Sequence, residues 1–171
     1  MAIVSFTLGL LLFLATVVAM EAVAYAVHRW VMHGPGWTLH RSHHEPRAGH
    51  FEANDWYGAI FALPSIALVW GGSNGGWGDW AIAVGAGVSA YGAIYFGFHD
   101  LVVHGRMGHR KAPRSPYMKR IVQAHRLHHA VETREHGLSF GFLWAPRPED
   151  LKAELKRRDR VGVRASAGAD A

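Results

Sequence analysis

The residues of this sequence best suited to chemistry are histidines that stand close together in four short segments. Residues 40–44 read HRSHH and residues 125–129 read HRLHH, so one three-histidine spacing occurs twice. Residues 28–33 (HRWVMH) and 99–104 (HDLVVH) each carry two histidines five positions apart. Imidazole nitrogens without thiolates suit iron, copper, nickel or zinc. The sequence therefore predicts a metal-binding protein.

The number of histidines indicates more than one metal ion. The sequence has 13 histidines and no cysteine, which excludes disulfides, thiolate metal sites and a cysteine nucleophile. A structural zinc ion needs only four ligands, whereas ten suit two ions in one pocket, with positions left for water or dioxygen. The alternatives are that the histidines are ordinary surface or core residues, or that they form a pH-sensing patch. For His50, His109 and His136, which lie outside the four motifs, we keep this alternative. The ten candidate metal ligands are His28, His33, His40, His43, His44, His99, His104, His125, His128 and His129.

The two spacings make different demands on the backbone. Positions i, i+3 and i+4 share one face of an α-helix, so each HxxHH triplet can direct its rings to one side. Positions i and i+5 lie far apart around an ideal α-helix, and such a pair suits one metal only where the helix ends or distorts. Gly34-Pro35 follows the first pair and Gly105 follows the second, which predicts helix ends at both places.

Long apolar stretches predict the elements that position these histidines. Residues 2–20 carry no charge, and the apolar run resumes past Glu21 to Val27; further runs cover 57–72 and 80–98, joined by the Gly-rich segment 71–79. A bilayer core takes about 20 apolar residues. We therefore expect an all-α integral membrane protein with about three transmembrane helices and a His-rich cytoplasmic cap of helices that holds a di-metal site. A buried hairpin in a soluble protein is the alternative for the second and third runs.

The chain is short enough for one domain. At 171 residues, we expect a single membrane domain over 1–160, with a charged surface helix at 149–160 and a disordered tail over 161–171.

The distribution of basic residues predicts the orientation in the membrane. All 18 Lys and Arg residues fall within 29–47 or 106–164. Because basic residues mark the cytoplasmic side, the N-terminus should lie outside, and the histidine motifs and the C-terminus in the cytoplasm. The net charge of +5 then reflects topology and contact with anionic membrane lipid. No nucleic-acid-binding motif is present, and we expect no nucleic-acid partner.

The order of the motifs resembles that of a known family. HxxxxH, HxxHH, HxxxxH and HxxHH in a small membrane protein resemble the fatty acid hydroxylase superfamily of non-haem di-iron membrane oxygenases. The resemblance covers about Glu21–Trp144. Within this superfamily, the sequence closely resembles the bacterial β-carotene hydroxylases. HEPR at 44–47, NDWY at 54–57 and SFGFL at 139–143 carry that narrower resemblance.

The resemblance implies a definite activity. Two non-haem iron ions held by the ten histidines would activate O2 and hydroxylate C3 and C3′ of β-ionone rings, taking β-carotene through β-cryptoxanthin to zeaxanthin. The carotenoid would come from the bilayer, here a bacterial cell membrane, and electrons from an external donor such as ferredoxin or a similar reductase system. The sequence has no dinucleotide fingerprint and no cysteine for an iron–sulfur cluster, which also favours an external donor. Two rivals stay open: a fatty-acyl or sterol hydroxylase or desaturase on the same scaffold, and a non-catalytic metal-binding or transport protein.

Several further residues are candidates for supporting roles. Glu21 lies within the first apolar run, seven residues before His28, and an ionisable group there is a functional hypothesis. Asp55 and Asp100 are candidate acceptors for ligand N–H groups; capping or loop roles are the alternative. Tyr95 and Phe98 are candidates for lining a substrate channel, although ordinary helix packing would also explain them.

Overall fold

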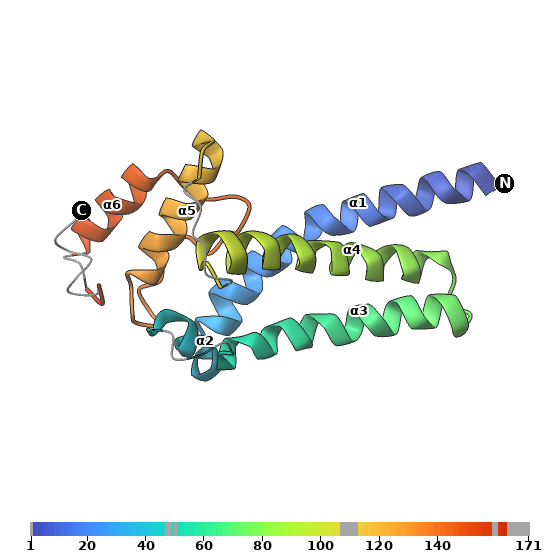
Figure 1. The fold of residues 1–171 in the computed structure, drawn as a ribbon, viewed down its shortest axis with the longest axis horizontal. Helices are drawn as coiled ribbons and strands as arrows, with labels where there is room; N and C mark the ends of the chain where they lie inside the picture. The colour runs from blue at the N-terminus through green and yellow to red at the C-terminus, as the bar shows by residue number, and fades with distance from the viewer. Residues whose placement is uncertain (1, 47–48, 50, 107–112, 159–160, 164–171) are drawn as a thin grey trace.

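The computed structural model describes residues 2–46, 49, 51–106, 113–158 and 161–163, and this part of the chain is helical without a β-sheet. A single isolated bridge joins Val131 to Val163. The helices, in chain order (Figure 1), are α1 (Ala2–Ala26), η1 (Val27–Met32), α2 (Trp37–His44), η2 (Ala53–Asp55), α3 (Trp56–Asn74), α4 (Asp79–Tyr95), η3 (Phe96–Val103), α5 (Pro116–His129) and α6 (Pro148–Arg157).

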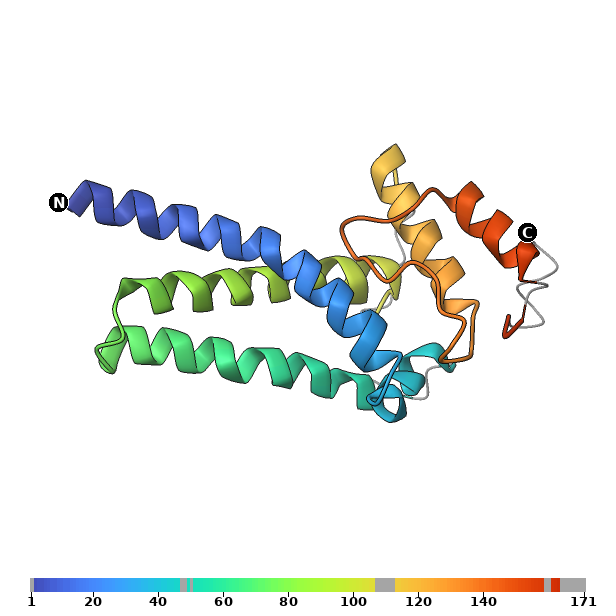
Figure 2. The ribbon, with the colours of Figure 1, turned by 180° about the vertical axis from the view of Figure 1, so that it is seen from behind.

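Three long helices form one half of the molecule. α1, α3 and α4 lie side by side, and α4 packs against both of the others (Figures 1 and 2). Glycines permit these close approaches: a Cβ on Gly85 would lie 2.8 Å from the Ser65 carbonyl oxygen of α3, and one on Gly87 would lie 2.7 Å from Thr16 Cβ of α1. α1 and α4 run in the same direction, so their C-terminal ends reach the same end of the bundle.

Two of these helices have the length and apolar character of membrane spans. Among the described residues, Ser5–Met32 and Asp79–Val103 pass that test. The first is almost entirely exposed, whereas the core helix of a soluble protein would be buried. α3 does not pass it, although it lies along α4 and exposes Ile60, Leu63 and Ile66. The expected third span therefore stays a prediction.

Both candidate spans end in π-helical turns. η1 continues α1 and η3 continues α4. Each turn is followed by a chain reversal: residues 33–36 form a turn before α2, and Gly105 has a positive φ of 63°. Both helix ends predicted from Gly34-Pro35 and Gly105 are confirmed.

The remaining helices form a cap at the other end of the molecule from residue 2 (Figure 1). The hydroxyl of Ser115 caps α5 by accepting from the Met118 amide at 3.2 Å, and Pro116 occupies the first turn, as is typical of helix starts. α6 carries Glu149 and Asp150 in its first turn and basic residues in its last, which complements the helix dipole. The charged helix predicted at 149–160 is confirmed as α6 over Pro148–Arg157, and residues 159–160 lie outside the described residues.

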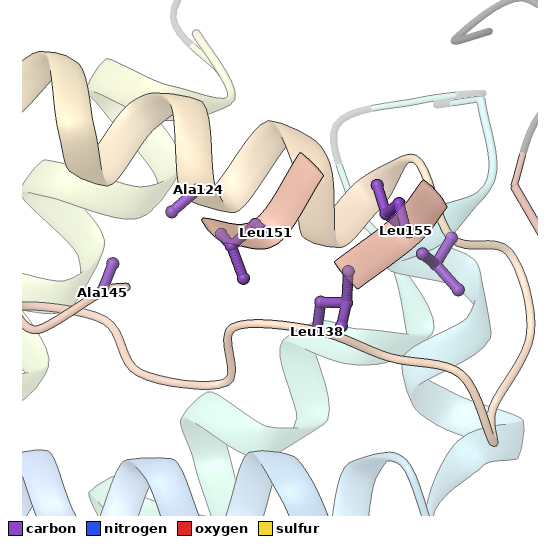
Figure 3. Packing of buried hydrophobic residues seen from close by; sticks show 6 residues of the cluster. Ala124, Leu138, Ala145, Leu151 and Leu155 are labelled. Carbon is purple, nitrogen blue, oxygen red and sulfur yellow. The ribbon is translucent and has the colours of Figure 1, made fainter. Parts of the chain in front are cut away.

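One apolar cluster joins α5, α6 and the segment between them. Its buried residues, most of them visible in Figure 3, are Ala124, Val131, Leu138, Ala145, Leu151 and Leu155. This packing holds residues 131–145 against α5, where their backbone carbonyls face the histidines. Of the predicted tail, Val163 pairs with Val131, and residues 164–171 lie outside the described residues.

Candidate metal centre

The cap and the ends of the two spans bring histidines into two groups. Within each group, one nitrogen from every ring lies within 4.8 Å of the corresponding nitrogens of the others. The tenth motif histidine, His44, places its Nε2 at 3.2 Å from His40 Nε2. We call the groups the five-histidine group (His43, His99, His104, His125 and His129) and the four-histidine group (His28, His33, His40 and His128).

The groups are assembled across the sequence motifs. Each HxxxxH pair stays together, the first in the four-histidine group and the second in the five-histidine group. Each HxxHH triplet is divided: α2 sends His40 to one group and His43 to the other, and α5 sends His128 to one group and His125 and His129 to the other. The two triplets therefore connect the two groups.

The π-helical turns explain how a five-residue spacing serves one site. The His33 amide donates to the His28 carbonyl at 3.0 Å, and the His104 amide donates to the His99 carbonyl at 2.9 Å. This i to i+5 bond adds one residue to the turn and returns the second histidine to the face of the first. The ring centroids of the pairs lie 5.3 Å and 4.5 Å apart. The expectation that the helix must end or distort at these pairs is confirmed.

Neutral acceptors orient the rings of the four-histidine group. His28 Nδ1 lies 3.0 Å from the Phe140 carbonyl, His33 Nδ1 3.0 Å from the Arg134 carbonyl, and His128 Nδ1 2.6 Å from the Leu138 carbonyl. A carbonyl only accepts, so each Nδ1 carries the proton and each Nε2 presents a lone pair. The acceptor of the fourth ring is Asn54 Oδ1, 2.8 Å from His40 Nδ1. His44, outside both groups, has the same kind of partner, with its Nδ1 3.0 Å from the Val131 carbonyl.

This choice of tautomer directs lone pairs toward one another. His28 Nε2 lies 3.2 Å from His40 Nε2, and His33 Nε2 lies 3.4 Å from His128 Nε2. Facing lone pairs at such distances repel unless a cation lies between them. Outer hydrogen bonds from ligand imidazoles to carbonyls are the usual arrangement in metal sites. The residues present therefore fit a bound metal ion.

The five-histidine group has charged neighbours instead. His43 Nδ1 lies 2.9 Å from Glu52 Oε2, and His99 Nδ1 lies 3.5 Å from Asp100 Oδ1, a charge contact without hydrogen-bond alignment. The guanidinium of Arg106 contacts Asp100, Glu52 and Asp55 together. The Nε2 of His129 is buried without a hydrogen-bond partner among the described residues, as expected of an atom that binds an ion.

Burial keeps His40, His43 and His128 neutral near pH 7. Desolvation lowers the pKa of His40 to about 4, against the opposing effect of its hydrogen bond to Asn54. Desolvation, joined by repulsion from neighbouring imidazoles, holds the pKa of His43 and His128 well below the ordinary value of 6.5. A neutral imidazole is the form that binds metal.

A cavity of about 540 Å³ lies between α1, α3 and α4 and reaches both histidine groups. His28 of one group and His99 of the other lie in its wall. Most of the remaining wall is apolar, and it includes Met20, Phe61 and Tyr95. An apolar molecule that enters between the helices therefore meets the edges of both groups.

Two of the predicted supporting residues have definite places beside this cavity. Tyr95 lines it and stacks on the His99 ring with centroids 4.5 Å apart. Phe98 packs edge-on against Phe142, with centroids 6.0 Å apart, and does not line the cavity. The structure thus places Tyr95, but not Phe98, where a channel residue was expected.

Glu21 binds the segment that supplies carbonyls to the histidines. Its Oε1 accepts from the backbone amides of Phe142, Leu143 and Trp144 at 2.8, 2.8 and 3.1 Å, and its Oε2 accepts from the Tyr91 hydroxyl at 2.7 Å. It makes no direct hydrogen bond to His28 among the described contacts. Glu21 therefore acts on the rings through the backbone of residues 138–144.

The two aspartates differ in their contacts. Asp100 lies beside His99 and pairs with Arg106. Its carboxylate is near His99 Nδ1, as the predicted acceptor role requires, but it is not aligned for a hydrogen bond. Asp55 instead accepts from Arg106 and from the Glu52 amide, the latter at 3.0 Å. The acceptors that the sequence did not reveal are Glu52, Asn54 and four backbone carbonyls; the segment NDWY was noted only for its resemblance, and carbonyls carry no sequence signal.

Comparison with known proteins adds an independent line of support. The sequence profile of a family described as Fatty acid hydroxylase matches residues 13–145. "Beta-carotene hydroxylase" of Pantoea ananas is 49% identical over 94% of this chain and 90% of its own length. The protein of the same name from Paracoccus sp. (strain PC1) is 50% identical over 86% of this chain and 90% of its own length. "Beta-carotene 3-hydroxylase 2, chloroplastic" of Arabidopsis thaliana is 32% identical over 84% of this chain and 50% of its own length. No solved structure matches.

Proposed function

We propose that this chain, which belongs to the fatty acid hydroxylase family, is a carotenoid hydroxylase that inserts oxygen from O2 at C3 and C3′ of β-ionone rings. β-Carotene would become zeaxanthin by way of β-cryptoxanthin. One observation carries the proposal: about half of the aligned residues are identical to those of two proteins named beta-carotene hydroxylase, and the alignments cover most of each chain. The apolar cavity that reaches both histidine groups supports the same substrate class.

The proposal includes two iron ions, one in each histidine group. The converging Nε2 lone pairs of the four-histidine group support it, and so does the His129 Nε2, which has no hydrogen-bond partner among the described residues. When bound, the iron pair supplies the activation of dioxygen, because no side chain can cleave an unactivated C–H bond by acid–base chemistry. The protein's own part is to hold neutral imidazoles in fixed tautomers around each position.

The cavity would bind the substrate. Its apolar wall would bind one β-ionone ring and exclude water from the metal-facing end, where Tyr95 lies over His99. Met20 and Phe61 would hold the hydrocarbon by packing alone, because it offers no hydrogen-bonding group. A long hydrocarbon dissolved in the bilayer would enter between α1, α3 and α4.

The proposed location is a bacterial cell membrane, with residue 1 outside and the cap in the cytoplasm. The placement of all Lys and Arg within 29–47 and 106–164 supports this orientation. α3 would form the third span, consistent with the apolar side chains it exposes. The histidine groups would then lie at the inner surface, where an external electron donor such as ferredoxin could reach them.

Product analysis tests the proposal. The chain is expressed in a bacterium that accumulates β-carotene, and pigments are separated and identified by mass. We expect singly and doubly hydroxylated products with the natural chain and none with His125→Ala. A folded, metal-loaded chain that yields only hydroxylated or desaturated fatty acids or sterols would establish the rival activity on the same scaffold.

Metal analysis of anaerobically purified protein tests the cofactor. We expect about two iron ions per chain, in keeping with the two histidine groups. A protein that holds zinc alone and consumes no oxygen would support a non-catalytic metal-binding role and end the hydroxylase proposal.

A further inference from the structure

The outer contacts of His43 and His99 in the five-histidine group differ in charge from those of the four-histidine group. In the four-histidine group, the Nδ1 partners of His28, His33 and His128 are backbone carbonyls, and that of His40 is the neutral amide of Asn54. In the five-histidine group, His43 and His99 face the carboxylates of Glu52 and Asp100. This contrast does not follow from the motifs, which use the same residue for every ligand.

The carboxylates beside the five-histidine group share a largely buried cation. Among the described residues, the Arg106 guanidinium contacts Glu52, Asp55 and Asp100. The side chains of Glu52, Asp100 and Arg106 are only 11–13% exposed, so solvent screens these charges weakly.

A carboxylate that accepts the Nδ1 proton of an imidazole makes the opposite nitrogen a stronger donor. The carboxylate draws the proton away from the ring, and the Nε2 lone pair gains electron density. His43 is arranged in this way, with Nδ1 at 2.9 Å from Glu52 and Nε2 at 3.1 Å from His99 Nε2. A backbone carbonyl exerts the same effect more weakly, because it carries no net charge.

We infer that the two metal positions are inequivalent, and that Glu52 and Asp100 make the five-histidine group the tighter binder of a divalent cation. The inference rests on the proposed pair of metal ions and assigns Glu52 and Asp100 as positioning residues. On this basis the five-histidine group fills first and empties last.

Titration with Co²⁺ alone tests the inference without any assay of activity. The full chain, purified in detergent and stripped of metal, is titrated against a competing chelator while the visible bands of bound Co²⁺ are followed. We expect two binding phases. His104→Ala should remove the tighter phase, and His33→Ala should remove the weaker one.

Substitution of the carboxylates then separates charge from structure. Glu52→Gln removes the charge on the hydrogen-bond acceptor of His43, and it should weaken the tighter phase by roughly 10- to 100-fold and leave the weaker phase unchanged. Asp100→Asn removes a charge beside His99 without breaking a hydrogen bond, so it should weaken the same phase by less. Asn54→Asp gives His40 a carboxylate partner and should tighten the weaker phase. Glu45→Gln is the matched control, because Glu45 pairs with Arg41 at an exposed position and should alter neither phase. Circular dichroism of each apo-protein checks that the helices are intact.

The contrary results are distinguishable. Two ions bound with equal affinity, or constants that do not respond to either carboxylate variant in a folded protein, would overturn the inference and leave the two-metal proposal standing. A single bound Co²⁺ per chain would overturn both.

Discussion

The amide of His33 donates to the carbonyl of His28 across 3.0 Å, and this bond spans five residues instead of the four of an α-helix. The extra residue brings the two imidazoles to one side of the chain, with ring centroids 5.3 Å apart. His99 and His104 repeat the relationship at the end of α4. The HxxxxH spacing in the sequence thus corresponds to a π-helical turn at the end of an apolar helix.

Removing one ligand should empty one group and stop turnover. His40→Ala and His125→Ala are each expected to abolish or severely reduce hydroxylation, because they take one ligand from the four- and five-histidine group respectively. Pigment analysis and iron content per chain measure the effect. His136→Ala is the control, since His136 lies outside both groups and contacts Thr133. Full activity of a correctly expressed His40→Ala protein would contradict the shared site.

Acidification should release the metal. Burial lowers the pKa of His40 to about 4 and that of His43 and His128 well below 6.5, so folding favours the neutral rings. The unfolded chain binds more protons below pH 6.5, and the stability present above that value is lost as the pH falls toward 4. We expect metal content and thermal stability to fall together across this range. Iron retained in full at pH 4 would contradict the neutral-imidazole description.

The carboxylate of Glu21 should matter for stability through the segment it binds. Glu21→Ala leaves the amides of Phe142, Leu143 and Trp144 without their acceptor, and each such loss costs about 1–3 kcal/mol where it is buried. Glu21→Gln keeps one oxygen acceptor and should be milder. Thermal unfolding in detergent measures the stabilities. We expect the natural chain to unfold at the highest temperature, Glu21→Gln at a lower one and Glu21→Ala at the lowest. If the Ala variant were as stable as the natural chain, this role of Glu21 would be wrong.

Filling the cavity should block the substrate and spare the metals. Gly92 lines the cavity, and a Cβ added there would meet no atom within 4 Å, so Gly92→Leu projects into open space without a clash. We expect roughly tenfold or greater loss of hydroxylation with unchanged iron content. Gly9→Leu is the matched control on α1, where an added Cβ also has open space. Equal rates for the two variants would show that the substrate does not use this cavity.

The sequence was sufficient for the features that depend on residue type and local spacing. Thirteen histidines without cysteine indicated the metal class, and the apolar stretches indicated helices. Glycine and proline after each HxxxxH pair indicated where the helices end, because these residues act on the backbone next to them. The charged helix α6 was predicted for the same local reason.

Only the tertiary structure decided which histidines act together and what surrounds them. The triplet of α2 is divided between the groups because the His40 ring meets His28 of η1, whereas the His43 ring meets His99 of η3. Glu52 reaches His43 through a loop, and the carbonyls of Phe140 and Leu138 reach their rings because Glu21 and the apolar cluster hold that segment in place. A backbone carbonyl has the same chemistry in every residue, so its role depends on position in space alone.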